Sequence, residues 1–222
     1  SGAVVYEMDD LELAGNLLVG GTLGVTGVLT ATSLDISGDI DVDGTSNLDV
    51  IDVDGAANFA ADVTFATGAD IITASAGTSN FRAGVNAGNS IASGGNYNTV
   101  VGDEAGTAIT TGDSNVFVGY QSGDATTTAD SNVGIGRGTL STNILSDHNT
   151  AVGNGALFTH NQTSTTDSYN TAVGSNAGAV VTTGVQNTII GGLAGDALTT
   201  GSYNVILGTN GGGGVTTGSQ NI

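Results

Sequence analysis

Three aspartates alternate with apolar residues in the segment Asp39-Ile-Asp-Val-Asp-Gly44, which matches the opening of an EF-hand calcium loop. An EF-hand needs a bidentate glutamate at the twelfth position of the loop, and that position is Val50 here. The same alternation is typical of a β-strand with one solvated face, on which the aspartates lie. We therefore expect no calcium site in this segment.

The side chains that most often carry catalysis or hold transition metals are scarce. His148 and His160 are the only histidines, and the sequence has no cysteine. A zinc-type cluster needs several such ligands. Carboxylates for glycoside hydrolysis are present, but such grooves usually carry aromatic sugar platforms and the sequence has no tryptophan. We expect no catalytic residue, no cofactor and no metal site, and hence no enzyme.

Recognition of another molecule is the remaining chemistry for which side chains are available. Tyr97, Tyr169 and Tyr203 each precede a repeated asparagine, so they are predicted either to form a discontinuous exposed column that stacks on glycans or to pack over neighbouring coils. Phe158 and His160 lie in the one repeat unit that is four residues longer, and we expect its insertion to bulge near residues 158–163. These five residues are the candidate receptor contacts.

The charge balance narrows the choice of partner. Only two basic residues, Arg82 and Arg137, oppose 21 acidic ones, which gives a net charge of −19. Nucleic acids are recognised largely by neutralising phosphates with basic side chains, and anionic membranes attract basic segments. No apolar stretch approaches the roughly 20 residues of a membrane span. We expect neither nucleic-acid binding nor membrane insertion.

A tandem repeat positions these residues. From position 98 onward an asparagine recurs mostly every 17 residues, followed four residues later by glycine in each complete unit, as in NTVVG and NVILG. Seventeen residues are too few for a helical hairpin, and the short apolar runs with glycine turns favour strands. Residues 80–222 are therefore predicted to form a β-solenoid or β-roll with one coil per unit. The repeated asparagines are at positions 98, 115, 132, 149, 170, 187, 204 and 221.

Two side-chain columns are expected in this solenoid. The repeated asparagine either stacks as a hydrogen-bonded ladder or only starts a local turn. The apolar residue at the fourth position of each unit is predicted to form a buried column. Its members are Val101, Val118, Ile135, Val152, Val173, Ile190 and Leu207.

A different pattern occupies residues 1–79. Segments such as Leu17-x-Val19-x-Gly21 and Leu34-x-Ile36-x-Gly38 repeat a step of six, which indicates very short strands joined by glycine turns. Such strands cannot bury a face alone, so we predict that three chains share one core around a threefold axis. A monomeric solenoid is the alternative.

The units NTVVGDEAGTAITTGDSNVFVGYQSGDATTT and NTAVGSNAGAVVTTGVQNTIIGGLAGDALTTGSYNVILG resemble repeats of bacteriophage tail-fibre proteins, and the resemblance covers roughly residues 80–222. Similar but shorter repeats occur in the heads of trimeric autotransporter adhesins. The resemblance implies an all-β, elongated, trimeric fibre in the virion tail, partnered by tail or baseplate proteins and by a glycan or protein of the host surface. A bacterial surface adhesin or filament and a fibre-borne polysaccharide depolymerase are the alternative functions.

Overall fold

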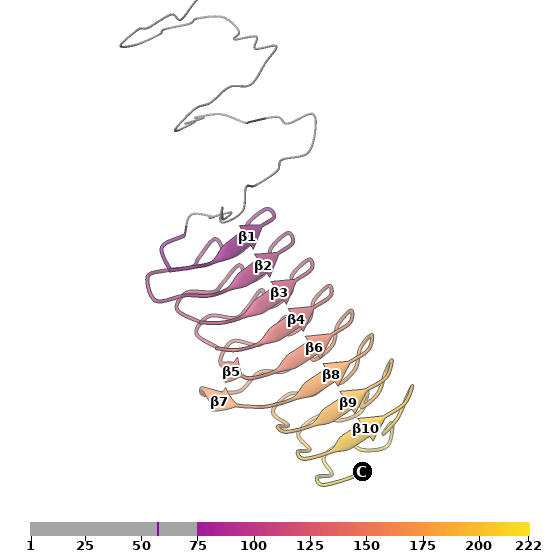
Figure 1. The fold of residues 1–222 in the computed structure, drawn as a ribbon. Helices are drawn as coiled ribbons and strands as arrows, with labels where there is room; N and C mark the ends of the chain where they lie inside the picture. The colour runs from indigo at the N-terminus through magenta and orange to yellow at the C-terminus, as the bar shows by residue number, and fades with distance from the viewer. Residues whose placement is uncertain (1–56, 58–74) are drawn as a thin grey trace, which may run out of the picture. The chain divides into compact units, whose positions relative to one another are not determined.

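The computed structural model describes residue 57 and residues 75–222, and the latter form a single-chain β-solenoid without helices (Figure 1). Each coil contributes one three-residue strand to an eight-stranded parallel sheet with the order β1-β2-β3-β4-β6-β8-β9-β10. The strands are β1 (Phe81–Ala83), β2 (Thr99–Val101), β3 (Val116–Val118), β4 (Val133–Ile135), β6 (Thr150–Val152), β8 (Thr171–Val173), β9 (Thr188–Ile190) and β10 (Val205–Leu207). The predicted all-β, elongated, repetitive fold with short strands and glycine turns is confirmed.

The pairing register follows the sequence repeat. Thr99 pairs with Val116 and Val116 with Val133, at the repeat length, whereas Phe81 pairs with Thr99 at a step of 18. The longer unit is accommodated without loss of register, because Thr150 pairs directly with Thr171. The hexad segment, the Asp39–Gly44 motif and most of the predicted first domain, 1–79, lie outside the described residues.

The first glycine of each unit is required by the close approach of successive coils. Gly119 has φ 131°, and a Cβ placed on it would lie 2.6 Å from the carbonyl oxygen of Gly136 in the next coil. Any side chain at this point would push the coils apart, because the backbone that it meets cannot move aside. The equivalent glycine of the last complete coil, Gly208, has no such neighbour.

The repeated asparagines form a buried ladder, which confirms the first of the two predicted alternatives. Oδ1 of Asn187 accepts hydrogen bonds from the backbone N–H and the side-chain amide of Asn204, both at 3.0 Å. Nδ2 of Asn187 donates to the carbonyl of Gly201 at 2.9 Å. Each rung therefore satisfies backbone groups in a corner that water does not reach, which is the condition for burying polar groups cheaply.

The prediction that the fourth-position side chains form a buried column is wrong, because these side chains are not buried. These side chains do stack in register, but they point outward: Ile190 is 42% exposed and Leu207 63% exposed. The buried column is formed by the preceding residue, the middle one of each strand. Its members from β2 onward are Val100, Phe117, Gly134, Ala151, Ala172, Ile189 and Ile206.

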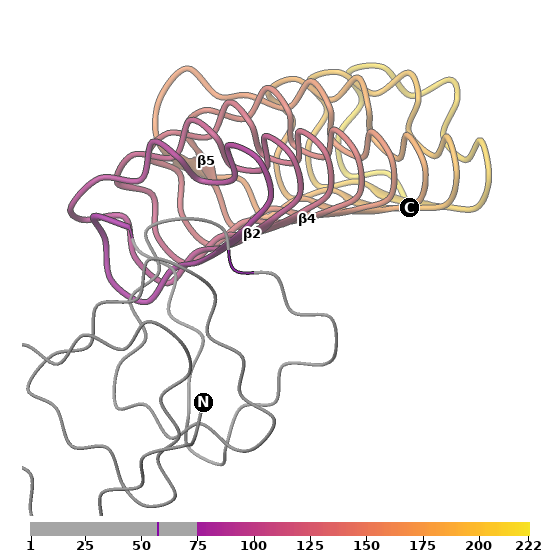
Figure 2. The same cartoon turned by 90° about the horizontal axis from the view of Figure 1, so that it is seen from above.

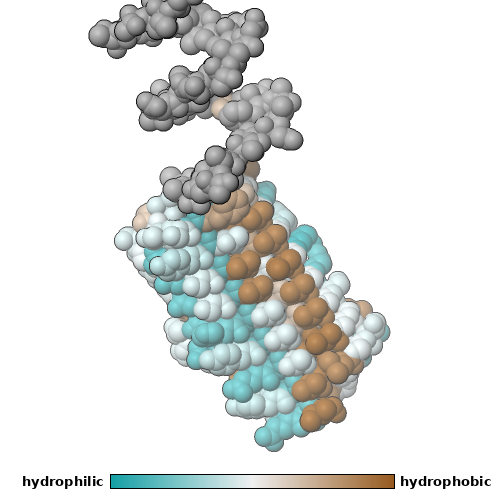
Figure 3. Space-filling model, in the orientation of Figure 1, coloured by the Kyte–Doolittle hydropathy of each residue, from teal (hydrophilic) through white to brown (hydrophobic). Residues whose placement is uncertain are grey.

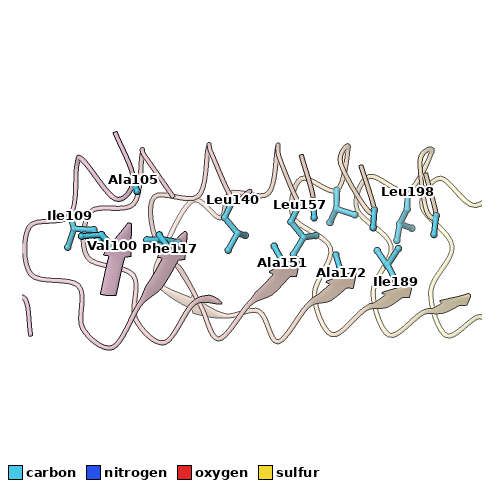
Figure 4. Packing of buried hydrophobic residues seen from close by; sticks show 14 of the residues in the cluster. Val100, Ala105, Ile109, Phe117, Leu140, Ala151, Leu157, Ala172, Ile189 and Leu198 are labelled. Carbon is cyan, nitrogen blue, oxygen red and sulfur yellow. The ribbon is translucent and has the colours of Figure 1, made fainter. Parts of the chain in front are cut away.

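Core volume is shared between this strand column and the opposite wall (Figure 4). Phe117 fills its coil from the strand and faces Gly123, whereas small strand residues such as Ala151 are accompanied by Leu157 from the other wall. Leu140 and Leu157 occupy the sites where other units have glycine, and they keep the left-handed backbone at φ 51° and φ 49°. Because interiors are close-packed, the gain from filling the core outweighs the strain of about 1 kcal/mol at each leucine.

Two glycine substitutions on this wall should therefore have unequal effects. Gly195→Ala adds a methyl group that lies 3.3 Å from Ile189 and 3.6 Å from Ile206 at the closest, so we expect it to cost about 1 kcal/mol, mainly from the left-handed φ. Gly123→Ala places its methyl group 2.5 Å from the Phe117 ring, and overpacking raises the expected cost to about 2 kcal/mol. Urea unfolding followed by circular dichroism measures both; equal costs would contradict this account of the core.

Candidate functional site

The three tyrosines share one corner of the solenoid. Tyr97, Tyr169 and Tyr203 are 63%, 51% and 52% exposed, and each has a left-handed φ directly before an Asn of the ladder. They do not touch one another. The intervening coils place Ser114, Ser131, His148 and Gln186 at the same corner.

One contact cluster does form at this corner. Nδ1 of His148 lies 3.1 Å from the Asp167 carboxylate, and the Tyr169 hydroxyl donates to the same carboxylate at 3.1 Å. The His148 and Tyr169 rings stack with centroids 4.9 Å apart. The hydrogen bond to Asp167 raises the pKa of Tyr169 above its ordinary value, since the neutral phenol is the donor. The cluster is solvent-exposed, and it connects the end of the longer unit, at Asp167 and Tyr169, to His148 of the preceding coil.

His160 is not a surface residue, so its assignment as a receptor contact is wrong. It is fully buried, in the interior column that Ile109, Val181 and Leu198 occupy in other coils. Burial lowers the pKa of His160 to about 4. Its Nδ1 atom has no hydrogen-bond partner among the described residues, and Nε2 lies 3.4 Å from Nδ2 of Asn170.

The insertion also lies later than predicted. Phe158 and His160 occupy regular coil positions, and the extra residues fall between Asn161 and the short strand β7 (Thr166–Asp167), which pairs with β5 (Ser146–Asp147). Figure 2 shows this segment projecting from the side of the solenoid. Asn161 and Gln162 still bond to the adjacent coils, through the Ile144 N–H and the Thr183 carbonyl.

Phe158 lines a surface hollow, which we call the notch, with a volume of about 390 Å³. The notch arises because two successive coils have Gly138 and Gly155 at a corner where the flanking coils carry Gln121 and Asn176. A Cβ on Gly138 would lie 3.5 Å from the Phe158 ring, so this ring reaches across the missing side chain. The lining residues are Gln121, Arg137, Gly138, Asn154, Gly155, Phe158, Thr159, Asn176, Ala179 and Val180.

Comparison with protein-family models, with curated proteins and with solved structures gave no match.

A second surface feature runs along the sheet. The first and third residues of its eight strands point outward, and we call these sixteen positions the outer strip. They are all Thr, Val, Ile, Leu, Phe or Ala, without a single charge. Figure 3 shows them as part of a hydrophobic stripe along the solenoid. In a chain of net charge −19 this strip is a neutral, largely apolar surface.

The described residues contain no group of three His, Cys, Asp or Glu side chains arranged to hold a metal ion. Within the same part of the chain, no helix is long and apolar enough to cross a membrane. The sequence reasoning missed both the notch and the outer strip. The two glycines of the notch, Gly138 and Gly155, stand at the same repeat position in successive units, but they become recognisable as one corner only once the coils are stacked.

Proposed function

We propose that this chain is part of a trimeric structural fibre of a phage virion, a tail fibre that lies outside the host cell and attaches the particle to its surface. Its partners are two further copies of itself, other tail or baseplate proteins, and a glycan or protein of the host surface. A stiff solenoid suits this role because it holds several weak contacts at fixed spacing, which raises their combined avidity.

The outer strip is the observation that supports assembly. Copies that each carry a net charge of −19 repel one another, so close contact needs a face without charges. Eight strands about 4.8 Å apart give a strip roughly 35–40 Å long and about 10 Å wide. That is roughly 400 Å² per chain, against about 800 Å² per partner in a standard interface. If three outer strips meet on a threefold axis, the strip of each chain contacts the strips of both neighbours. Each further coil of the solenoid adds to the contact area.

Native mass measurement tests the assembly. We expect a species of three chains, each of 21.5 kDa. The double variant Val152→Asp/Ile190→Asp places two carboxylates on the strip and is expected to yield monomers with an unchanged circular dichroism spectrum. Tyr203→Ser, which reproduces the serine of other coils at the tyrosine corner, should remain trimeric. A wild-type chain that runs as a clean monomer would contradict the trimer.

Immunogold electron microscopy tests the location. Antibodies against residues 80–222 are expected to label the tails of virions. Labelling of filaments on bacterial cells instead would replace the virion assignment by a surface adhesin.

A further inference from the structure

The notch combines the groups that recognise a sugar. Side-chain amides of Gln121, Asn154 and Asn176 border it and supply both donors and acceptors for hydroxyl groups. Nε2 of Gln121 donates to the Glu104 carboxylate at 2.8 Å, which fixes this amide and leaves its carbonyl oxygen to accept. Phe158 offers an apolar ring surface. The volume of about 390 Å³ falls within the range of about 300–1,000 Å³ typical of small-molecule pockets.

Arg137 adds a positive charge to this surface. Within residues 75–222 no carboxylate forms an ion pair with Arg137, although the chain has 21 acidic residues. Its guanidinium lies 5.9 Å from the centroid of the Tyr120 ring, a cation–π contact that positions the group and leaves its N–H donors available. None of the residues that line the notch is acidic. A planar guanidinium matches a carboxylate through two parallel hydrogen bonds, so the missing partner is best supplied by a ligand.

We infer that the notch binds a carboxylate-bearing sugar unit of an acidic polysaccharide. The carboxylate pairs with Arg137, the ring packs on Phe158, and the hydroxyls bond to the amides. This inference rests on the proposed attachment function and names the class of receptor. At physiological ionic strength the repulsion from distant carboxylates is screened beyond about 8 Å, whereas the direct Arg137 contact is not.

Isothermal titration with tetragalacturonate and with its methyl-esterified form tests the inference, since the two probes differ in their carboxylate charge. We expect the acid form to bind at least tenfold more tightly. Arg137→Gln should remove that preference. Gly138→Gln should abolish binding of both probes, because it fills the notch with the side chain that the preceding coil tolerates at φ 53°. Tyr203→Ser, at the tyrosine corner, should bind like the wild type.

Three results would overturn this assignment: no binding of the acid probe by the wild-type chain, equal binding of the two probes, or undiminished binding by Gly138→Gln. Native mass of the same samples separates this failure from failure of the fibre proposal. If the protein is a trimer and does not bind the acid probe, only the proposed ligand class is contradicted. If it is a monomer and binds the acid probe, only the proposed assembly is contradicted.

Discussion

Replacing Asn187 with alanine is expected to lower the free energy of unfolding by roughly 4 kcal/mol, a large share of the stability of an ordinary domain. Asn187 is fully buried and forms an interior rung of the ladder, bonded to the rungs on both sides. Its removal leaves the backbone N–H of Asn204 and the carbonyl of Gly201 without these partners, at a corner where Asn187 and Asn204 are fully buried. Each buried group stranded in this way costs about 1–3 kcal/mol.

The adjacent residue provides the matched control. Gln186 is exposed and precedes the same rung, so Gln186→Ala should change stability by no more than about 0.5 kcal/mol. Urea unfolding gives the overall loss, and hydrogen exchange should show it concentrated in the coils on either side of residue 187, because repeat arrays are stabilised by nearest neighbours. If Asn187→Ala matched its control, the ladder would be a consequence of the coil and not a cause of its stability.

The repeat spacing was sufficient to predict one β-solenoid coil per unit, but it left the asparagine ladder as one of two alternatives, and the hydrogen bonds of the structure decide between them. The ladder follows from one constraint: a polar side chain that recurs at a fixed step in an apolar context bonds to its own copies. The orientation of the strand was predicted wrongly because the two residues directly before the glycine are both apolar in units such as NTIIG. Period-two alternation cannot be read from three residues when the middle position is Gly134 or Ala151 in some coils.

The missing information lay on the opposite wall. Leu140 and Leu157 stand where other units have glycine, and this exchange occurs in two of the three units whose strand centre is glycine or alanine. A large side chain at one position therefore accompanies a small one at the other, which indicates that the two positions face each other across the core. His160 was misplaced for a similar reason. It follows its asparagine by the same eleven residues that separate Ile109 from Asn98, so column alignment predicts burial, whereas residue type alone suggests exposure.

The notch was not predicted from the sequence because it is formed where two successive coils lack a side chain. Gly138 and Gly155 are ordinary turn glycines in a repeat that contains many others. Only the stacking of coils shows that they are neighbours between two amide side chains and beneath Phe158. Arg137 then has a defined position, whereas in the sequence it is one isolated basic residue.

Acidification is expected to destabilise the solenoid through His160. Burial lowers the pKa of His160 from an ordinary value of 6.5 to about 4, so between these two values the unfolded chain binds a proton that the folded chain does not. Stability from this group is fully present above pH 6.5 and declines as the pH falls toward 4. The loss reaches roughly 3 kcal/mol, of which about 2 kcal/mol is lost by about pH 5.

His160→Val isolates this effect, because valine is the residue of the same interior column in the next coil, Val181. We expect the free energy of unfolding of the variant to fall by about 2 kcal/mol less than that of the wild type between about pH 8 and pH 5. Asp147, whose pKa burial raises, titrates in both proteins, so its contribution cancels in the comparison. Gln186→Ala, which alters an exposed residue and removes no titratable group, should keep the acid sensitivity of the wild type. Identical pH profiles for wild type and His160→Val would show that the imidazole takes up its proton inside the folded coil, and that the buried column is open to water at this point.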